Sequence, residues 1–388
     1  MIKHIFTLIW NKRRKNFLLF LEIFLAFAVL FAVFTFAVQS FRSYSSPLGF
    51  DTEDNWIAFM EWDQDLDSTA LLDMKLRLER ELEDKPQIIS AAYVGNITPF
   101  SGSTWSTTTD DNGFELSTRL VEGDEDYLET AGVNVIKGRH FNEDDYNAKY
   151  QAIIFNQLLV ESTFGDKPVL DSVILLNGEK KVVGIIDHFK YMGEFSEEAN
   201  LTVSLKPKSS RDLGNLQMRL APGTPADFEA EVNRTISEIT KRNDFIIQNL
   251  DAERIEESRD TWVPLIASLC ICAFLIINVA LGLFGVLYYT ISKRRAEIGL
   301  RRTLGATKAV ISRQFVGEVL LVSGAALLIG IFFAIQLPLM NVMDIDDINY
   351  YLSIGFTSVL ILSVVLLCAF YPSRQAANIH PAMALHEE

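Results

Sequence analysis

The segment SKRRAEIGLRRTLGATK, residues 292–308, decides how the rest of the chain is arranged. It holds six cations and one anion, and two long apolar runs flank it, Trp262–Thr290 and Phe315–Leu339. A helix needs about 20 apolar residues to cross the roughly 30 Å of hydrocarbon in a bilayer. Both runs are long enough, so the sequence predicts that the cationic segment joins two membrane spans on one side of a membrane.

Two further runs have the same character, Phe17–Val38 with one charge and Leu352–Tyr371 with none. The sequence therefore predicts four spans, at residues 17–39, 262–290, 315–339 and 352–371. The first span follows the basic cluster Lys12–Lys15, as a cleaved secretory signal would. Its apolar core exceeds the about 7 to 15 residues typical of such a signal, so a retained anchor is the better interpretation.

The placement of lysine and arginine predicts the orientation, because positively charged flanks stay in the cytoplasm. Residues 1–16, the loop 291–314 and residues 372–388 carry cations and are predicted to be cytoplasmic. The short loop 340–351 holds three aspartates and no cation, so it is predicted to be external. Residues 40–261 then form an extracytoplasmic domain. With a net charge of −15 we expect no nucleic-acid partner, since phosphate binding needs a basic surface.

The extracytoplasmic domain is predicted to be α+β. A strand over Asn55–Trp62, a helix from Asp67 or Ser68 to just before Pro86, and a strand over Ile88–Val94 form one βαβ unit. The order repeats with a strand at Leu216–Leu220, a helix at Pro225–Lys241 and a strand at Phe245–Leu250. Pairing the two units predicts a split, ferredoxin-like sandwich, as in porter domains, with residues 97–210 as an inserted, mostly-β subdomain. Asn177-Gly178 predicts a hairpin turn within it.

The fold class that follows is an α-helical membrane protein with four transmembrane helices and an α+β extracytoplasmic domain. This domain shows no spacing typical of a catalytic or zinc site, so we expect neither a catalytic residue nor a metal site. The acidic run Glu122–Asp126 is the nearest approach to a cation site. It lacks the alternating ligands of a calcium loop, and a solvated turn is the favoured interpretation.

The cationic segment has the pattern of a short amphipathic helix. Ala296, Leu300 and Leu304 form one narrow apolar stripe, and Glu297 can pair with Arg301 one turn later. Gly305 can end the helix and Thr307 can cap the next one. One explanation is topological, since the cations hold the loop inside and contact anionic lipid. The stripe also fits a groove on a partner protein, and both explanations stay open.

Ionisable and amide side chains within the spans are functional candidates, because a polar group in hydrocarbon is costly. They are Glu22, Asn278 and Glu318. Glu22 is expected to reach the cytoplasmic interface or to pair with Lys15 or another basic neighbour. Glu318 is expected to pair with Arg313 or with Arg301 and Arg302. Asn278 joins subunits or bonds to its own backbone.

Four stretches resemble the FtsX-like permease family, which includes the permease part of MacB-type ABC transporters. Arg294–Phe315 (RRAEIGLRRTLGATKAVISRQF) followed by Glu318 resembles the family's cytoplasmic motif, and Tyr371–Leu385 resembles its closing segment. Residues 123–141 and 152–187 are similar to the MacB-type periplasmic core. One long external loop after the first span, then three spans, is also the family's layout.

The resemblance implies a non-catalytic permease subunit in the plasma membrane of a bacterium. No GxxxxGK[ST] motif occurs in the sequence, so the ATPase is expected to be a separate chain that binds ATP and Mg, with no cofactor bound by this one. The expected partners are that ATPase, a second identical or related permease subunit, membrane lipids and, in some systems, a membrane-fusion adaptor with an outer-membrane factor. The residues expected to couple to the ATPase are Arg294, Arg295, Glu297, Gly299, Arg301, Arg302, Gly305 and Ala306.

The expected function of the subunit is efflux or mechanotransmission, in which movement driven by the ATPase reaches the extracytoplasmic domain. Two alternatives within the family are a regulator of cell-wall hydrolases and a lipoprotein-release subunit. An alternative of another class is a membrane-anchored sensor or scaffold that works without an ATPase.

Overall fold

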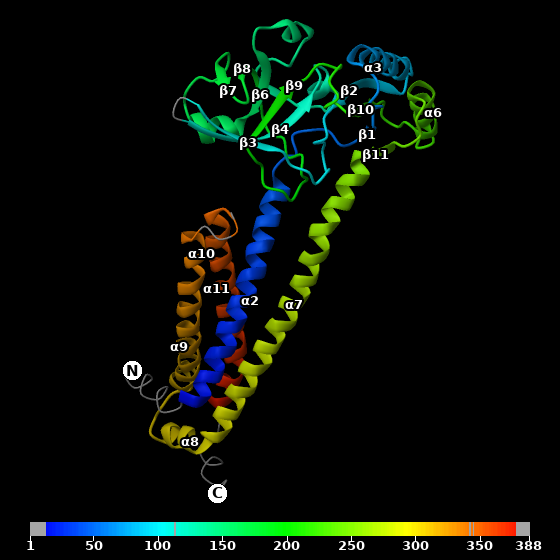
Figure 1. The fold of residues 1–388 in the computed structure, drawn as a ribbon. Coiled ribbons are helices and arrows are strands. Elements are labelled where there is room, and N and C mark those ends of the chain that lie inside the picture. The colour runs from blue at the N-terminus through cyan, green and yellow to red at the C-terminus, as the bar shows by residue number, and fades with distance from the viewer. Residues whose placement is uncertain (1–12, 112–113, 341–342, 344, 378–388) are drawn as a thin grey trace. The chain divides into compact units, whose positions relative to one another are not determined.

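The computed structural model describes residues 13–111, 114–340, 343 and 345–377 (Figure 1). The chain divides into two compact units. The helical unit contains the chain up to Arg42 and from Trp262 onward, and the α+β domain contains Ser43–Thr261. The unit boundaries fall inside two long helices, so each of these helices begins in one unit and ends in the other.

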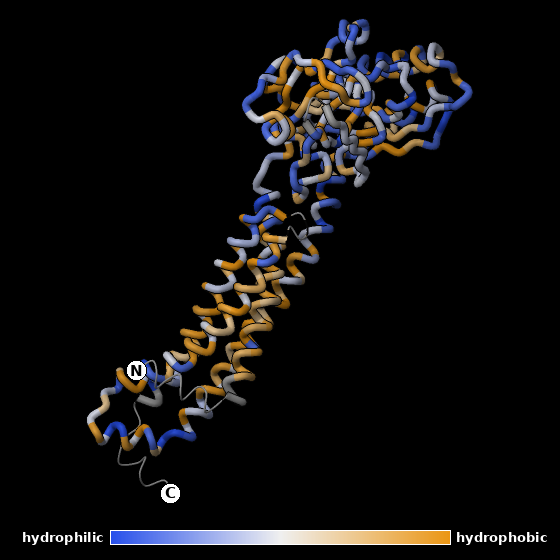
Figure 2. Tube along the Cα trace, turned by 60° about the vertical axis from the view of Figure 1, so that its left-hand side comes forward, coloured by the Kyte–Doolittle hydropathy of each residue, from blue (hydrophilic) through white to orange (hydrophobic). Residues whose placement is uncertain are grey.

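Four long helices dominate the helical unit. They are α2 (Arg13–Ser45), α7 (Leu250–Lys293), α9 (Lys308–Ala334), which the short α10 (Gln336–Leu339) extends, and α11 (Asp347–Ala377). All four are long and apolar enough to cross a membrane, over Phe17–Ser45, Leu250–Lys293, Lys308–Leu339 and Asp347–Arg374. Figure 2 shows apolar residues along these helices. The predicted fold class of four spanning helices with an α+β domain is confirmed.

The phenylalanine-rich face of α2 lies in the common core of the helical unit. Ile23 and Phe27 of α2 are buried there with Ala326 of α9 and Val365 of α11. At Gly330 a Cβ atom would lie 2.5 Å from the Phe27 ring, so the glycine allows α2 and α9 to approach closely. Gly324 has open space where its Cβ would be, so it makes no such close approach within the described chain.

The two βαβ units of the α+β domain interleave as the sequence predicted. They are β1 (Asn55–Phe59), α3 (Ser68–Glu83) and β2 (Ile88–Val94), and β10 (Asn215–Leu220), α6 (Phe228–Thr240) and β11 (Ile246–Asn249). The four strands lie in the order β11-β1-β10-β2, with antiparallel neighbours. Asp67 caps α3 by accepting hydrogen bonds from the amides of Thr69 and Ala70, and Leu71, Leu78 and Leu82 of α3 are fully buried.

The strands between the two βαβ units extend the same sheet as β2-β4-β9-β6-β8-β5, with β3 on β4 and β7 on β8. Their bounds are β3 Ser106–Asp111, β4 Phe114–Gly123, β5 Val135–Gly138, β6 Gln151–Asn156, β7 Val173–Leu175, β8 Glu179–Ile186 and β9 Leu201–Leu205. The short helices α4 (Tyr127–Thr130), η1 (Glu143–Asn147), α5 (Gln157–Leu159) and η2 (Val160–Phe164) connect them. Asn177 and Gly178 both have positive φ between β7 and β8, which confirms the predicted turn.

The two halves of the sheet meet at a single ladder pair, Val94 with Gly123. Two hydrogen bonds beside it involve Asp124, the first residue after β4. The Asp124 amide donates to the Tyr93 carbonyl at 3.0 Å, and the Tyr93 amide donates to the Asp124 carboxylate at 2.7 Å. A side-chain oxygen therefore takes the place of a ladder carbonyl at this junction.

Candidate functional site

The cationic segment forms the helix α8 (Arg295–Thr303), which is shorter than the quoted stretch. Ser292 and Lys293 still belong to α7, and Lys308 already begins α9. Gly305 has a φ of 97°, and the Ala306 amide donates to the Arg301 carbonyl at 3.0 Å, so the helix ends in a left-handed turn. Thr307 caps α9 by accepting from the Val310 amide, as predicted.

The packed face of α8 is not the predicted stripe. Ile298 and Gly299 are the buried residues, and Ile298 packs with Ile291, Ile311 and Phe315. The stripe residues Ala296, Leu300 and Leu304 are exposed, Leu300 to 53% and Leu304 to 79%. The stripe therefore faces away from the rest of the described chain, where a partner could cover it.

Arg294, which lies between α7 and α8, joins both to α9. Its Nε lies 3.0 Å from Glu297 and its terminal nitrogen 3.1 Å from Glu318, with the guanidinium 5.5 Å from the Phe315 ring centre. The Arg294 side chain is only 9% exposed. Burial lowers the pKa of Arg294, but Glu318 and Glu297 outweigh this effect and the net shift is upward, so the guanidinium stays charged.

The partner of Glu318 differs from the expected ones. Its carboxylate accepts from Arg294 and, at 3.1 Å, from the Gln314 amide, rather than from Arg313, Arg301 or Arg302. Arg294 lies 24 residues before Glu318 and could not be chosen from helical spacing. The predicted pair of Arg301 with Glu297 is confirmed at 2.6 Å.

The remaining predicted coupling residues lie around this network. Arg301 also donates to the Gln314 side chain at 2.7 Å. Arg295 is exposed, Arg302 is half-buried, and Ala306 packs against the cluster around Ile298. The structure thus brings Arg294, Glu297, Arg301 and Glu318 into one charged network.

The two other polar groups of the spans have local roles. A Cβ atom at Gly282 of α7 would collide with the Glu22 carboxylate, so this carboxylate lies against the α7 backbone. Among the described side chains no cation pairs with Glu22, and Lys15 lies outside them. The Asn278 amide donates to the Phe274 carbonyl of its own helix at 2.8 Å, which is the second of its two expected roles.

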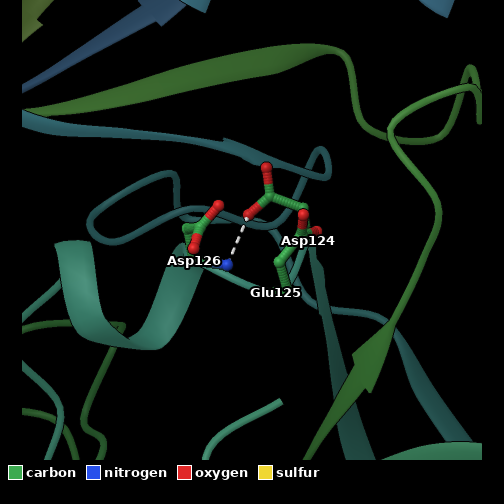
Figure 3. A group of neighbouring side chains, drawn as sticks. All are labelled: Asp124, Glu125 and Asp126. Atoms are coloured by element: carbon green, nitrogen blue, oxygen red, sulfur yellow. Dashed lines mark hydrogen bonds between the residues drawn. The ribbon is translucent and has the colours of Figure 1, made fainter. Parts of the chain in front are cut away.

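The acidic run is not a solvated turn. Asp124 is fully buried, Asp126 donates its amide to the Asp124 carboxylate at 3.2 Å, and the three acidic groups at 124–126 lie within 4.8 Å of one another (Figure 3). Burial raises the pKa of Asp124. A solvated turn was expected because the run lacks the ligand spacing of a calcium loop, and the long-range partner that permits burial was not visible in the sequence.

That partner is Lys208. Its ammonium lies 2.6 Å from Glu79, 3.1 Å from Asp126, 3.5 Å from Glu125 and 3.8 Å from Asp124. Burial lowers the pKa of Lys208, but the carboxylates outweigh it and the net shift is upward. The ammonium thus supplies the positive charge that a metal ion would bring to this acidic group.

Known families match both units. A model described as MacB-like periplasmic core domain matches residues 17–235, more than half of the chain, and one described as FtsX-like permease C-terminal matches residues 269–381. The second match includes α8 and its contacts with α9.

Individual relatives are distant. The chain is 26% identical over 316 residues to the macrolide export ATP-binding/permease protein MacB of Bartonella quintana, covering 76% of this chain and 46% of that one. It is 22% identical to the probable syringafactin export ATP-binding/permease protein SyfD of Pseudomonas syringae, covering 78% and 48%. The chain thus spans about half the length of these curated relatives.

Among solved structures, the periplasmic region of MacB from Actinobacillus actinomycetemcomitans aligns with a TM-score of 0.39 at 14% identity, covering 56% of this chain and 98% of that one. The two family models together extend from the first predicted span to the end of α11. The chain belongs to the FtsX-like permeases with a MacB-like periplasmic core domain, and it is homologous to the permease portion of MacB.

Proposed function

We propose that the chain is the permease subunit of a MacB/FtsX-type ABC transporter, and that it couples ATP hydrolysis by a separate ATPase to movement of its α+β domain. The observation that carries the proposal is the exposed apolar face of α8. Leu300 and Leu304 have no covering element in the described chain, while Ile298 anchors the helix from the other side. An amphipathic helix with one anchored and one open apolar face fits a groove on a partner.

The orientation in this proposal follows from charge. The α8 segment and both chain ends lie in the cytoplasm of a bacterium, and the α+β domain lies outside its plasma membrane. The ATPase then meets α8 on the side where ATP is available. ATP and Mg bind to that ATPase, and this chain binds no cofactor and catalyses no reaction.

The transmission route in this proposal is α7. It is one helix from Leu250 in the α+β domain to Lys293, two residues before α8 begins, and Pro264 does not interrupt it. Arg294 fixes its end to α8 and α9 through Glu297 and Glu318. A displacement of α8 by the ATPase therefore moves α7, which stays helical along its whole length although Pro264 removes one main-chain hydrogen bond.

The partners of the working complex are the ATPase, a second identical or related permease subunit and the surrounding lipid. A membrane-fusion adaptor and an outer-membrane factor would complete an export system, with movement of the α+β domain as the output. A nucleic-acid partner is not part of the proposal, because the net charge of −15 opposes phosphate binding.

The test is purification of the tagged chain from its native host membrane, with bound proteins identified by mass spectrometry. The wild-type chain should retain an ABC ATPase. The L300S/L304S variant should retain on the order of tenfold less, because two leucine contacts are lost. L76S is the matched control, since Leu76 is a leucine on a helix of the α+β domain with 43% exposure.

Protease accessibility of the α+β domain checks that each variant inserts in the same orientation. Two results would overturn the proposal. One is a wild-type chain that retains no ABC ATPase, which would favour a sensor or scaffold. The other is an L300S/L304S variant that retains as much ATPase as L76S does.

A further inference from the structure

Both helices that connect the two units have an end inside the α+β domain. The domain contains α2 from Ser43 onward and α7 as far as Thr261. One loop of the domain, which follows β8, contacts both of these ends. We call residues 189–195 of this loop, FKYMGEF, the bridging loop.

Lys190 of the bridging loop binds the end of α2. Its ammonium donates to the Ser43 carbonyl at 2.6 Å, to the Ser46 hydroxyl at 3.0 Å and to the Glu194 carbonyl at 2.7 Å, and the residue is 2% exposed. The last carbonyls of a helix have no partner within the helix and carry a partial negative charge. A buried ammonium at this position therefore stabilises the end of α2 and fixes it to the loop.

Glu194 of the bridging loop binds the start of α7. Its carboxylate accepts from Arg254 at 2.7 and 2.9 Å and from the Ser258 hydroxyl at 3.1 Å. Arg254 and Ser258 lie one turn apart on α7, so the carboxylate fixes both the position of the helix and its rotation. The Glu194 side chain is 13% exposed, which limits solvent screening of the pair.

Close packing reinforces both contacts. The Phe195 ring stacks on the Tyr44 ring of α2 with 5.3 Å between centres. Gly193 has a φ of 106°, and a Cβ atom there would lie 3.1 Å from Glu257 of α7. Glycine is the residue that adopts this φ and leaves room for the helix.

The same loop is rooted in the core of the sheet. Phe189 and Tyr191, on either side of Lys190, are 1% and 3% exposed and belong to the main apolar cluster of the domain. Phe189 contacts Phe50 ring to ring, and the Tyr191 carbonyl accepts from the Phe100 amide at 2.7 Å. Phe189 and Tyr191 therefore anchor the loop in the core, while Lys190 between them binds the end of α2.

We infer that the bridging loop is the positioning element that holds the end of α2 and the start of α7 together and joins both to the sheet. This role is a property of the domain by itself. A second role rests on the proposed function: the loop is the contact through which a displacement of α7 reaches the sheet. Lys190 and Glu194 are its positioning residues, and each acts on a different helix.

The first experiment measures amide hydrogen exchange in the full-length chain in detergent micelles without nucleotide. K190M should speed exchange in residues 43–46 by about tenfold, and E194Q should do so in residues 251–258, because each loses charge-assisted hydrogen bonds. The control is K180M, which removes another buried lysine of the same domain, one that donates to the Ser204 hydroxyl at 3.3 Å. It should alter neither segment.

Exchange in β6 and β9 shows whether a variant has unfolded as a whole. If K190M unfolds the domain, E194Q carries the test, because glutamine preserves the shape of the side chain. Unchanged exchange of residues 251–258 in E194Q overturns the inference. Equal acceleration of both segments in K180M and in E194Q also overturns it, because the effect would then be general destabilisation.

The second experiment adds the ATPase and a non-hydrolysable ATP analogue. In the wild-type complex the analogue should change the rate of amide exchange in the sheet. The K190M/E194Q variant should still bind the ATPase, but the analogue should change its exchange rate at least about tenfold less. A nucleotide effect of full size in K190M/E194Q overturns the transmission role of the loop. A wild-type chain that binds no ATPase contradicts the proposed function instead and leaves the first experiment to decide the positioning role.

Discussion

The buried cations of the two units differ in kind and in the groups that bind them. Among the residues that the structure describes, the buried lysines are Lys75, Lys180, Lys190 and Lys208, and all lie in the α+β domain. The buried arginine of the described chain is Arg294, and it lies in the helical unit. Lys75, Lys190 and Lys208 each bind several oxygens that converge on the ammonium. Arg294 instead binds carboxylates on two helices, Glu297 on α8 and Glu318 on α9.

The difference follows from the shapes of the two side chains. An ammonium is a compact charge with three donors, which suits converging carbonyls and carboxylates. A guanidinium is a planar fork that reaches acceptors on separate elements. The α+β domain thus uses lysine to neutralise or cap a site within a single packed body, and the helical unit uses arginine to fix helices to one another.

The largest effect is expected for K208M. Methionine would leave Glu79 and Asp124 buried without their cation, and removing one partner of a buried ion pair costs about 3 to 5 kcal/mol. Thermal and denaturant unfolding of the full-length chain in micelles, followed by tryptophan fluorescence, measures the loss. The matched control is K206M, because Lys206 pairs with Glu122 and Asp212 with its side chain 26% exposed. Equal losses in the two variants would show that burial of the ammonium is not the cause.

An intermediate effect is expected for R294K. Lysine keeps the charge but cannot reach Glu297 and Glu318 at once, so about 1 to 3 kcal/mol should be lost. The melting temperature of the chain in micelles and its retention of the ATPase are the measurements, and both should fall. R302K is the control, since Arg302 is half-buried next to the same network. If R294K lowers the melting temperature and the retention of the ATPase no more than R302K does, the planar shape of the guanidinium is unimportant.

The smallest effect is a pH dependence at Lys75. Burial lowers the pKa of Lys75 to about 8, although Asp124 and Asp212 act in the opposite direction. Its usual pKa is 10.5, so between these values the folded state binds fewer protons than the unfolded state. The free energy of unfolding should therefore rise with pH above about 8, by about 1 kcal/mol between pH 7 and pH 9.

K75M isolates this contribution, because the difference between wild type and variant cancels the other titrating groups. The stability of the wild type relative to K75M should increase from pH 7 to pH 9. Trp62 reports locally, since the Lys75 ammonium lies 5.2 Å from its ring centre. A difference that stays constant across this range would show that the buried ammonium keeps its proton.

Local patterns allowed much of this structure to be predicted. The lengths of the apolar runs predicted the spanning helices, and the patterns of apolar residues with their helix caps predicted the βαβ units. Gly305 and Thr307 predicted the turn after α8. Each of these depends on residues a few positions apart. The apolar stripe of α8 at Ala296, Leu300 and Leu304 was visible in the sequence, whereas the packing of Ile298 on the other side of the helix was not predicted. One helix alone does not show which of two apolar faces meets its own chain.

Contacts between distant residues could not be predicted in this way. Lys75 occupies the apolar face of α3 because its ammonium donates to the Ser210 and Leu213 carbonyls, which are more than 130 residues away. Lys190 is 147 residues from Ser43. A lysine is buried only when the fold supplies acceptors for its ammonium, and these acceptors are distant in the sequence. From the sequence alone both lysines would therefore be placed at the surface.

The junction beside Asp124 has a consequence for how the domain could fail. Strands are ordinarily joined by main-chain groups that every residue supplies, so a single substitution rarely breaks a sheet. Here one rung between the halves of the sheet depends on a carboxylate, which accepts from the Tyr93 amide at 2.7 Å. Replacement of Asp124 by alanine removes that hydrogen bond and leaves the two halves of the sheet joined there by main-chain bonds alone, from the Asp124 amide to Tyr93 and from the Gly95 amide to Glu122.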